Sequence, residues 1–176
     1  MNSLEIIAVV VAILGIIFTV LENRVCWLIN ILASLLYLKI FSDSELRGQM
    51  LLQIIYIVVG VFGYIYWGKD NQVAIQRIGS RVTFLLILLS VFTGYLAYAL
   101  FNNLLWVDMS LTAGSIIATY LTAKKYLENW LLWFIINLAS IWLFCFKDLN
   151  LTATLYLAYA VLSVIGYRQW RNSIYS

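Results

Sequence analysis

The sequence contains neither proline nor histidine, and charged residues make up only 11% of its 176 positions. Without histidine, the commonest general base and the commonest metal ligand are both missing. The two cysteines, Cys26 and Cys145, lie far apart inside apolar runs and form no CxxC pair. The residues therefore favour a protein that is not an enzyme and that needs neither a cofactor nor a metal ion.

Hydrophobic residues, by contrast, are abundant: they make up 64% of the chain, and the mean hydropathy is +0.95. A soluble globular protein is nearer half apolar and a quarter charged. The net charge of +3 comes from basic residues at the ends of apolar runs, so there is no patch that would bind nucleic acid. The composition predicts an integral membrane protein whose main surroundings are the lipid bilayer.

Seven apolar runs divide the chain. Each is about 17 to 20 residues long, which suits a helix that crosses the roughly 30 Å hydrocarbon layer. Lipid offers no partner for backbone amides, so each run must be helical. The sequence therefore predicts an all-α integral membrane protein with seven transmembrane helices, at residues 4–21, 25–41, 50–67, 82–101, 106–123, 130–146 and 151–167.

The basic residues predict the orientation, because cytoplasmic loops carry an excess of Lys and Arg. Three lie toward one side of the predicted bundle, namely Lys39, Arg47 and Lys147. Eight lie toward the other side, namely Arg24, Lys69, Arg77, Arg81, Lys124, Lys125, Arg168 and Arg171. We expect the N-terminus outside the cell and the C-terminus in the cytoplasm.

An internal repeat relates the two halves of the chain. The motif Leu-Glu-Asn at residues 21–23, followed by Trp27, recurs at residues 127–129, followed by Trp133. This match has an offset of 106 residues and aligns Asn30 with Ile136. A second match relates residues 63–67 to 166–170 and Tyr56 to Tyr159, at an offset of 103. A shorter loop before the last helix is the expected reason for the difference.

The repeat predicts how the helices are organised. Three helices reverse the direction of the chain, so one linker helix is needed before a second triplet can enter the membrane with the same orientation. We expect a first repeat at residues 1–67, a linker with the fourth helix at 68–105, and a second repeat at 106–176. This 3+1+3 arrangement of parallel halves is SWEET-like, and transporters built from repeats bind their substrate near the midplane between the halves.

Polar residues inside the predicted spans are candidates for that site, since each needs a partner or a ligand. They offer aromatic faces and amide groups, which suit a flat, polar heterocycle. Helical spacing places them on shared faces, with the strongest candidates on the third, sixth and seventh helices and two more on the second: Gln53, Tyr56, Trp133, Asn137, Tyr156, Tyr159, Trp27 and Asn30. Because Asn30 aligns with Ile136 in the 106-residue register, the pair on the second helix is expected to contribute less.

Other readings of these residues stay open. Asn and Gln can simply join helices to each other, and we expect Trp67 and Trp170, at the ends of spans, to lie in the interfacial aromatic belt. Apart from Glu5, at the very start of the first span, Asp108 is the only carboxylate inside a predicted span. It is a candidate partner for a cationic ligand, but a single acid near a helix end is a poor proton relay. Glu22 and Glu128 are expected to be structural, capping the next helix or pairing with Arg24 or Lys125.

With these motifs the chain resembles the PnuC-type vitamin transporter family. The resemblance rests on Gln-x-x-Tyr at 53–56, on Gly-Tyr-x-x-Trp at 63–67 and on Lys-x-x-Glu-Asn-Trp-x-x-Trp-x-x-x-Asn at 125–137, with Leu-Thr-Ala at 151–153. It covers nearly the whole chain. It implies a homotrimer in the bacterial inner membrane that carries nicotinamide riboside, with relatives for thiamine and riboflavin, and a cytoplasmic kinase that traps the vitamin by phosphorylation.

We therefore expect a facilitator of vitamin uptake that works by alternating access without a coupled ion. Three alternatives remain. An intramembrane enzyme lacks suitable catalytic groups. A channel would need charged rings or backbone carbonyls along a continuous pore. A non-catalytic membrane scaffold would use Gln53 and Asn137 only to join helices.

Overall fold

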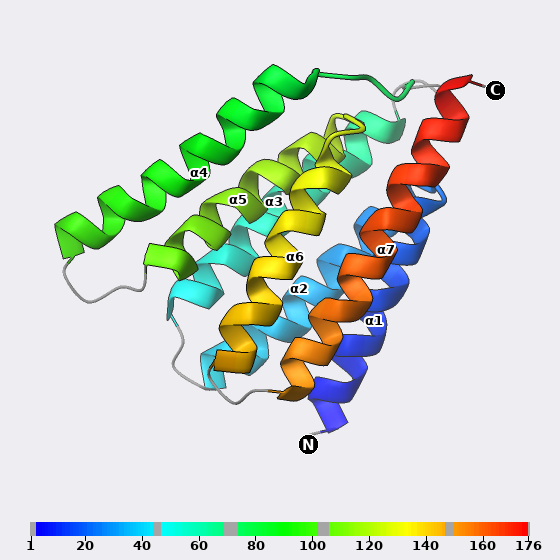
Figure 1. Ribbon diagram of the computed structural model, residues 1–176. Helices are drawn as coiled ribbons and strands as arrows, with labels where there is room; N and C mark the ends of the chain where they lie inside the picture. Colours follow the sequence, from blue (N-terminus) through cyan, green and yellow to red (C-terminus); the bar gives the residue numbers. More distant parts are fainter. Residues whose placement is uncertain (1–2, 44–46, 69–73, 102–105, 147–149, 176) are drawn as a thin grey trace.

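The computed structural model describes residues 3–43, 47–68, 74–101, 106–146 and 150–175. Within these residues the chain forms seven α-helices (Figure 1), which confirms the predicted helix content. The last helix continues eight residues beyond its predicted end at residue 167, because neither glycine nor proline interrupts the polar segment that follows the apolar run. The helices are α1 Ser3–Val20, α2 Val25–Asp43, α3 Arg47–Gly68, α4 Ser80–Phe101, α5 Trp106–Ala123, α6 Asn129–Phe146 and α7 Asn150–Tyr175.

Six of the helices form a ring. Going around it, α1 packs against α2, α2 against α3, α3 against α5, α5 against α6, α6 against α7, and α7 again against α1. The remaining helix, α4, packs on the outside of α5, at the edge of the bundle (Figure 1). A ring of six helices leaves a central space, and none of the α4 side chains that the structure describes lines it.

Two tight turns with the same backbone geometry connect α1 to α2 and α5 to α6. Glu22 in the first turn and Lys125 in the second both have a φ of 55°, which is the left-handed region that non-glycine residues rarely adopt. The N–H of Glu22 donates to the carbonyl of Thr19 at 3.1 Å, and the N–H of Lys125 donates to the carbonyl of Thr122 at 3.0 Å. The two turns are therefore structural equivalents, 103 residues apart.

This spacing corrects the predicted register of the repeat. Sequence letters aligned Glu22 with Glu128 and Trp27 with Trp133, at an offset of 106, but the structure makes Lys125 the equivalent of Glu22 and Trp130 the equivalent of Trp27. The offset of 103 thus holds for both matches, and no shorter loop is needed. The two Leu-Glu-Asn motifs gave the wrong alignment because they occupy different positions. The first lies in the turn after α1, and the second lies at the start of α6.

The misaligned Glu128 has its own structural role. Its carboxylate accepts hydrogen bonds from the backbone N–H groups of Ile78 at 3.0 Å and Gly79 at 3.2 Å, and Arg77 lies 3.8 Å away. It therefore anchors the segment before α4 to the start of α6. Glu128 thus has the structural role expected of it, but through loop amides and Arg77 rather than through a helix cap or Lys125. Lys125 pairs with Glu22 instead, at 3.1 Å, which confirms the pairing expected for that residue.

The outer surface of the bundle is apolar. Val58 on α3, Phe84 on α4 and Leu157 on α7 are each more than half exposed, which suits lipid rather than water. By length and composition, two helices in the described chain are long and apolar enough to cross a membrane, Val25–Asp43 and Met50–Gly68. Shorter apolar stretches occur at Ile6–Val20, Ser80–Leu96, Met109–Ala123 and Asn129–Trp142.

Candidate functional site

A cavity of about 900 Å³ lies inside the ring of six helices. On α1 its lining reaches from Ile6 to Thr19, and on α2 from Trp27 to Phe41. On α3 and α7 the last lining residues are Tyr56 and Ser163. The cavity therefore extends along the inside of the bundle from the end where α1 begins and stops before the C-terminal halves of α3 and α7.

The structure brings together eight of the nine residues that the sequence singled out. The side chain of the ninth, Asp108, lies outside the described part of the structure, so its predicted role stays a prediction. Asp108 itself belongs to α5. The eight that line the cavity come from four helices and are Trp27, Asn30, Gln53, Tyr56, Trp133, Asn137, Tyr156 and Tyr159.

Two amide side chains in this lining have unmet hydrogen-bonding capacity. Gln53 is only 8% exposed, yet it forms no hydrogen bond with another described residue. Asn30 is likewise unpaired there, and its amide lies directly against Gly15 of α1, where a larger residue would displace it. Buried amides such as Gln53 normally find partners, and both amides line the cavity, so these groups are suited to bind a polar ligand.

Asn137 differs from the other two amides. It is 3% exposed, and its Nδ2 donates to the hydroxyl of Ser163 at 3.2 Å. That hydroxyl donates in turn to the carbonyl of Tyr159 at 2.8 Å. The Asn137 carbonyl oxygen is engaged by no described residue, so this amide joins α6 to α7 and still offers an acceptor.

The aromatic side chains of the lining are held in defined orientations. The Nε1 of Trp133 donates to the hydroxyl of Thr122 at 3.3 Å, which ties the indole on α6 to α5. Tyr156 and Tyr159 meet edge to face, with their ring centroids 5.8 Å apart and an interplanar angle of 73°. The cavity thus presents rigid ring surfaces, on which a flat heterocycle stacks favourably.

Four tryptophans close the cavity at the end opposite the start of α1. Trp27 meets Trp67 edge to face at 5.5 Å, Trp130 meets Trp170 in the same way at 5.4 Å, and Trp67 lies 6.1 Å from Trp170. All four are at most 6% exposed. We refer to Trp27, Trp67, Trp130 and Trp170 as the tryptophan layer.

Hydrogen bonds between adjacent helices of the ring hold part of the tryptophan layer in place. The Nε1 of Trp67 donates to the carbonyl of Ala123 on α5 at 2.9 Å, and the Nε1 of Trp170 donates to the carbonyl of Thr19 on α1 at 3.1 Å. The expectation that Trp67 and Trp170 lie in an interfacial belt was wrong, because each turns inward to a backbone acceptor on a neighbouring helix. The N–H groups of Trp27 and Trp130 are buried without a hydrogen-bond partner in the described structure.

Basic residues gather at the same end, behind the tryptophan layer. Lys125 lies 4.7 Å from the Trp67 ring, and Lys124 lies 4.3 Å from the Tyr66 ring. Arg24 is positioned over Tyr64 at 5.2 Å. Stacking of cations on aromatic faces is favourable when they are partly shielded from water. The basic side predicted from the sequence is therefore the side that the tryptophan layer closes.

Sequence reasoning missed a set of polar cavity residues, most of which carry hydroxyl groups. Helix α5 contributes four of them, and the neighbouring helices contribute others. The signal was present as hydroxyl residues at helical spacing on α5, but single Ser and Thr residues are common in membrane helices because they satisfy their own backbone. The missed residues include Thr112, Ser115, Thr119, Thr122, Ser34, Tyr37 and Asn129.

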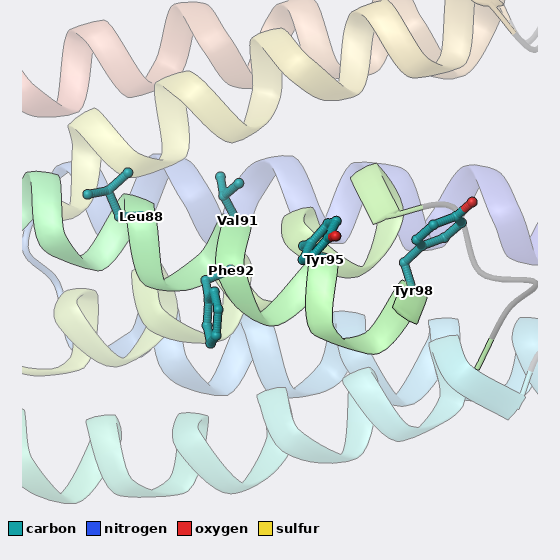
Figure 2. A pocket seen from close by; sticks show the side chains of 5 residues that line it. All are labelled: Leu88, Val91, Phe92, Tyr95 and Tyr98. Atoms are coloured by element: carbon teal, nitrogen blue, oxygen red, sulfur yellow. The ribbon is translucent and has the colours of Figure 1, made fainter. Parts of the chain in front are cut away.

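A second hollow lies apart from the cavity. It measures about 730 Å³ and is lined by five residues of α4 alone, as Figure 2 shows: Leu88, Val91, Phe92, Tyr95 and Tyr98. Phe92, Tyr95 and Tyr98 are all strongly exposed. The hollow is an apolar face of the peripheral helix, without the amide groups that distinguish the central cavity.

A ring of apolar helices around a central cavity with polar and aromatic lining defines a membrane transporter. Comparison with known families gives the particular assignment: the chain belongs to the nicotinamide mononucleotide transporter family, whose model matches residues 2–172. This confirms the family that the sequence motifs indicated, and it places the chain among transporters rather than enzymes.

Individual relatives agree with this assignment. The chain is 24% identical over 170 residues to the nicotinamide riboside transporter PnuC of Escherichia coli (strain K12) and to that of Shigella flexneri, with 76% of this chain and 70% of each relative covered. A crystal structure of the vitamin B3 transporter PnuC has the same fold, with a TM-score of 0.78 at 24% identity, covering 98% of this chain and 82% of that one.

Proposed function

We propose that this protein is a facilitator that carries nicotinamide riboside across the bacterial inner membrane. The observation that carries the proposal is one cavity lined both by the amides of Gln53 and Asn30, which have no hydrogen-bond partner among the described residues, and by the indole of Trp133, which Thr122 holds in place. Amides without a protein partner and aromatic rings in the same lining are what a hydroxylated heteroaromatic ligand requires. The names of the relatives in Escherichia coli and Shigella flexneri support the same substrate.

In this proposal the nicotinamide ring stacks on Trp133, and Gln53, Asn30 and Asn137 bind polar groups. Tyr56, Tyr156 and Tyr159 complete the walls, Trp27 forms part of the floor, and Asp108 is a possible partner for the positive charge. Stacking contributes roughly 1 to 3 kcal/mol per base in nucleic-acid complexes. Two ring contacts and several hydrogen bonds then approach the roughly 8 kcal/mol of a micromolar ligand.

We further propose that transport proceeds by alternating access between two repeats, residues 1–67 and 106–176, joined by the linker at 68–105, with all seven helices in the membrane. The tryptophan layer would be the barrier on the cytoplasmic side. Two of its four indoles are unpaired, and an unpaired buried N–H costs about 1 to 3 kcal/mol. Such a layer closes the cavity without making the closed state so stable that it cannot open.

The remaining expectations complete the proposal. The N-terminus lies outside and the C-terminus in the cytoplasm, three copies form a homotrimer, and a cytoplasmic kinase phosphorylates the vitamin so that it cannot return. No ion is coupled, because a cation already gains about 2.3 kcal/mol per 100 mV from an interior-negative potential. Thiamine and riboflavin are the alternative substrates, since other flat heterocycles fit similar walls.

Binding measurements test the substrate. Purified protein is titrated calorimetrically with nicotinamide riboside, thiamine and riboflavin, and thermal unfolding is followed with each. We expect saturable binding and stabilisation with nicotinamide riboside alone. Stronger binding of either other vitamin would assign that substrate instead, and no response to any of the three would favour a membrane scaffold, in which the amides merely join helices.

A further inference from the structure

One wall of the cavity carries a stripe of hydroxyl groups. Thr112, Ser115, Thr119 and Thr122 follow one another at helical spacing on α5, so they share a face of that helix. All four line the cavity. We refer to these four residues as the hydroxyl stripe.

The opposite wall carries no such stripe, although the two helices are structural equivalents. At the spacing of 103 residues, the counterparts of the stripe on α1 are Val9, Ala12, Ile16 and Thr19, and these also line the cavity. Three of the four hydroxyl positions are thus replaced by aliphatic residues. The cavity has a polar wall on α5 and an apolar wall on α1, so a ligand with one polar side binds in one orientation.

The hydroxyl stripe offers hydrogen-bond acceptors. Thr119 donates its hydroxyl proton to the carbonyl of Ser115 at 2.7 Å, and Thr122 donates to the carbonyl of Ala118 at 2.9 Å. The side chain of Ser115 is hydrogen-bonded to that of Tyr56, another residue of the cavity lining. A hydroxyl that has donated its proton keeps lone pairs that accept. This wall therefore suits a ligand that brings O–H donors, and the unpaired carboxamide of Gln53, 92% buried in the same cavity, is available to bind the ligand's remaining polar groups.

Thr122, at the C-terminal end of the stripe, fixes the position of the Trp133 ring. Thr122 accepts the hydrogen bond from Trp133 and lies 3.1 Å from the Oδ1 of the fully buried Asn129, whose Nδ2 donates to the carbonyl of Tyr126 at 2.6 Å. A ring surface and a row of acceptors are thereby held next to each other. That is the geometry of a ligand in which a flat base is joined to a hydroxylated sugar.

We propose that the hydroxyl stripe is the specificity-determining surface for the sugar: Ser115 and Thr119 accept hydrogen bonds from the ribose hydroxyls while the base stacks on Trp133. The inference rests on the function proposed above and goes beyond it, because it assigns the sugar to α5 and predicts that the hydroxyls, and not only the base, select the ligand.

The test is a thermodynamic cycle between ligand and protein. Purified wild-type protein and the Ser115→Ala/Thr119→Val double variant are titrated with nicotinamide riboside and with its 2′,3′-dideoxy analogue. The wild type should prefer the riboside by about tenfold, the equivalent of one to two hydrogen bonds. The double variant should bind both ligands alike, with an affinity for the dideoxy analogue within about twofold of the wild-type value.

The matched control is Thr19→Val on α1. It also removes a buried cavity hydroxyl that donates to its own helix, in this case to the carbonyl of Gly15 at 2.8 Å, and it should leave the preference for the riboside intact. Thr119→Ser, which keeps the acceptor, should also retain it. An undiminished preference in the double variant, or its loss in Thr19→Val, overturns the inference. A wild-type protein that binds no riboside overturns the proposed function itself.

Discussion

The carboxylate of Glu22 and the ammonium group of Lys125 lie 3.1 Å apart, although the residues are separated by 103 positions in the chain. Each occupies the same place in one of two equivalent turns, with the same left-handed φ of 55°. The pair joins the turn after α1 to the turn after α5, next to the tryptophan layer. An equivalent position in the two halves has therefore acquired opposite charges that bind each other.

This pair should contribute to stability. Its side chains are 25% and 11% exposed, so Lys125→Met removes a partly buried charged hydrogen bond and should lower the free energy of unfolding by about 1 to 3 kcal/mol. The exposed pair of Lys39 and Asp43, at 2.6 Å, is the matched control, and Lys39→Met should change stability by less than about 1 kcal/mol. Thermal unfolding in detergent measures both, and equal effects would contradict the prediction.

Two glycines should be needed for close packing of the tryptophan layer. A Cβ at Gly63 would overlap the ring of Trp27, and one at Gly166 would lie 2.6 Å from that of Trp130. Because large rings in a packed layer cannot shift freely, Gly63→Ala and Gly166→Ala should each destabilise the protein by about 1 to 3 kcal/mol.

Gly114→Ala is the control for these two substitutions. There the nearest atom to a new Cβ is the flexible end of Ile136 at 3.3 Å, and alanine favours the helix by up to about 1 kcal/mol. We expect little change or a small gain in the midpoint of thermal unfolding. A loss as large as that of Gly63→Ala would show that the tryptophan rings are not the cause.

Ligand affinity should depend on Trp133 and Asn137. Replacing either with alanine should weaken vitamin binding by about 1 to 3 kcal/mol, the magnitude of a lost ring contact, with the fold retained. The corrected register aligns Asn30 with Trp133 rather than with Ile136, so the reason for expecting a smaller effect at Asn30 no longer holds. Because Asn30 is an unpaired cavity amide, Asn30→Ala should weaken vitamin binding about as much as Asn137→Ala. Calorimetric titration of each variant measures the loss of affinity.

Trp27 should behave differently from these residues. It is 2% exposed and packed in the tryptophan layer, so Trp27→Ala should destabilise the fold by about 3 to 5 kcal/mol. We expect a lowered midpoint of thermal unfolding before any specific loss of affinity. A variant with normal stability and abolished binding would instead make Trp27 a direct contact of the ligand.

Transport should be independent of a proton gradient. A proton-driven cycle needs a group that changes its charge while facing each side in turn, and apart from Glu5, at the very start of the first span, Asp108 is the only carboxylate inside a predicted span. In liposomes without kinase, an inward pH gradient at zero membrane potential should not raise the internal concentration of labelled vitamin above equilibrium. Accumulation that disappears in Asp108→Asn would show that the protein is a proton symporter.

The sequence by itself determined the helices and pointed to eight of the residues that line the cavity. An apolar run in lipid must be helical because its amides have no other partner, so composition was enough to locate seven helices. Polar and aromatic residues within such runs are costly unless they are used, and for that reason Gln53, Asn137 and Trp133 were found without coordinates.

Only the tertiary structure decided the register of the repeat and the direction in which the tryptophans point. Residue identity aligned Glu22 with Glu128, whereas backbone geometry aligns Glu22 with Lys125. Identity is not enough because a glutamate can have different partners: Glu22 binds Lys125, and Glu128 binds the loop amides of Ile78 and Gly79. Likewise, an indole at the end of a helix can face the membrane interface or turn inward. Trp67 and Trp170 turn inward because carbonyls of Ala123 and Thr19 on neighbouring helices are within reach, and that proximity exists only once the ring of helices has closed.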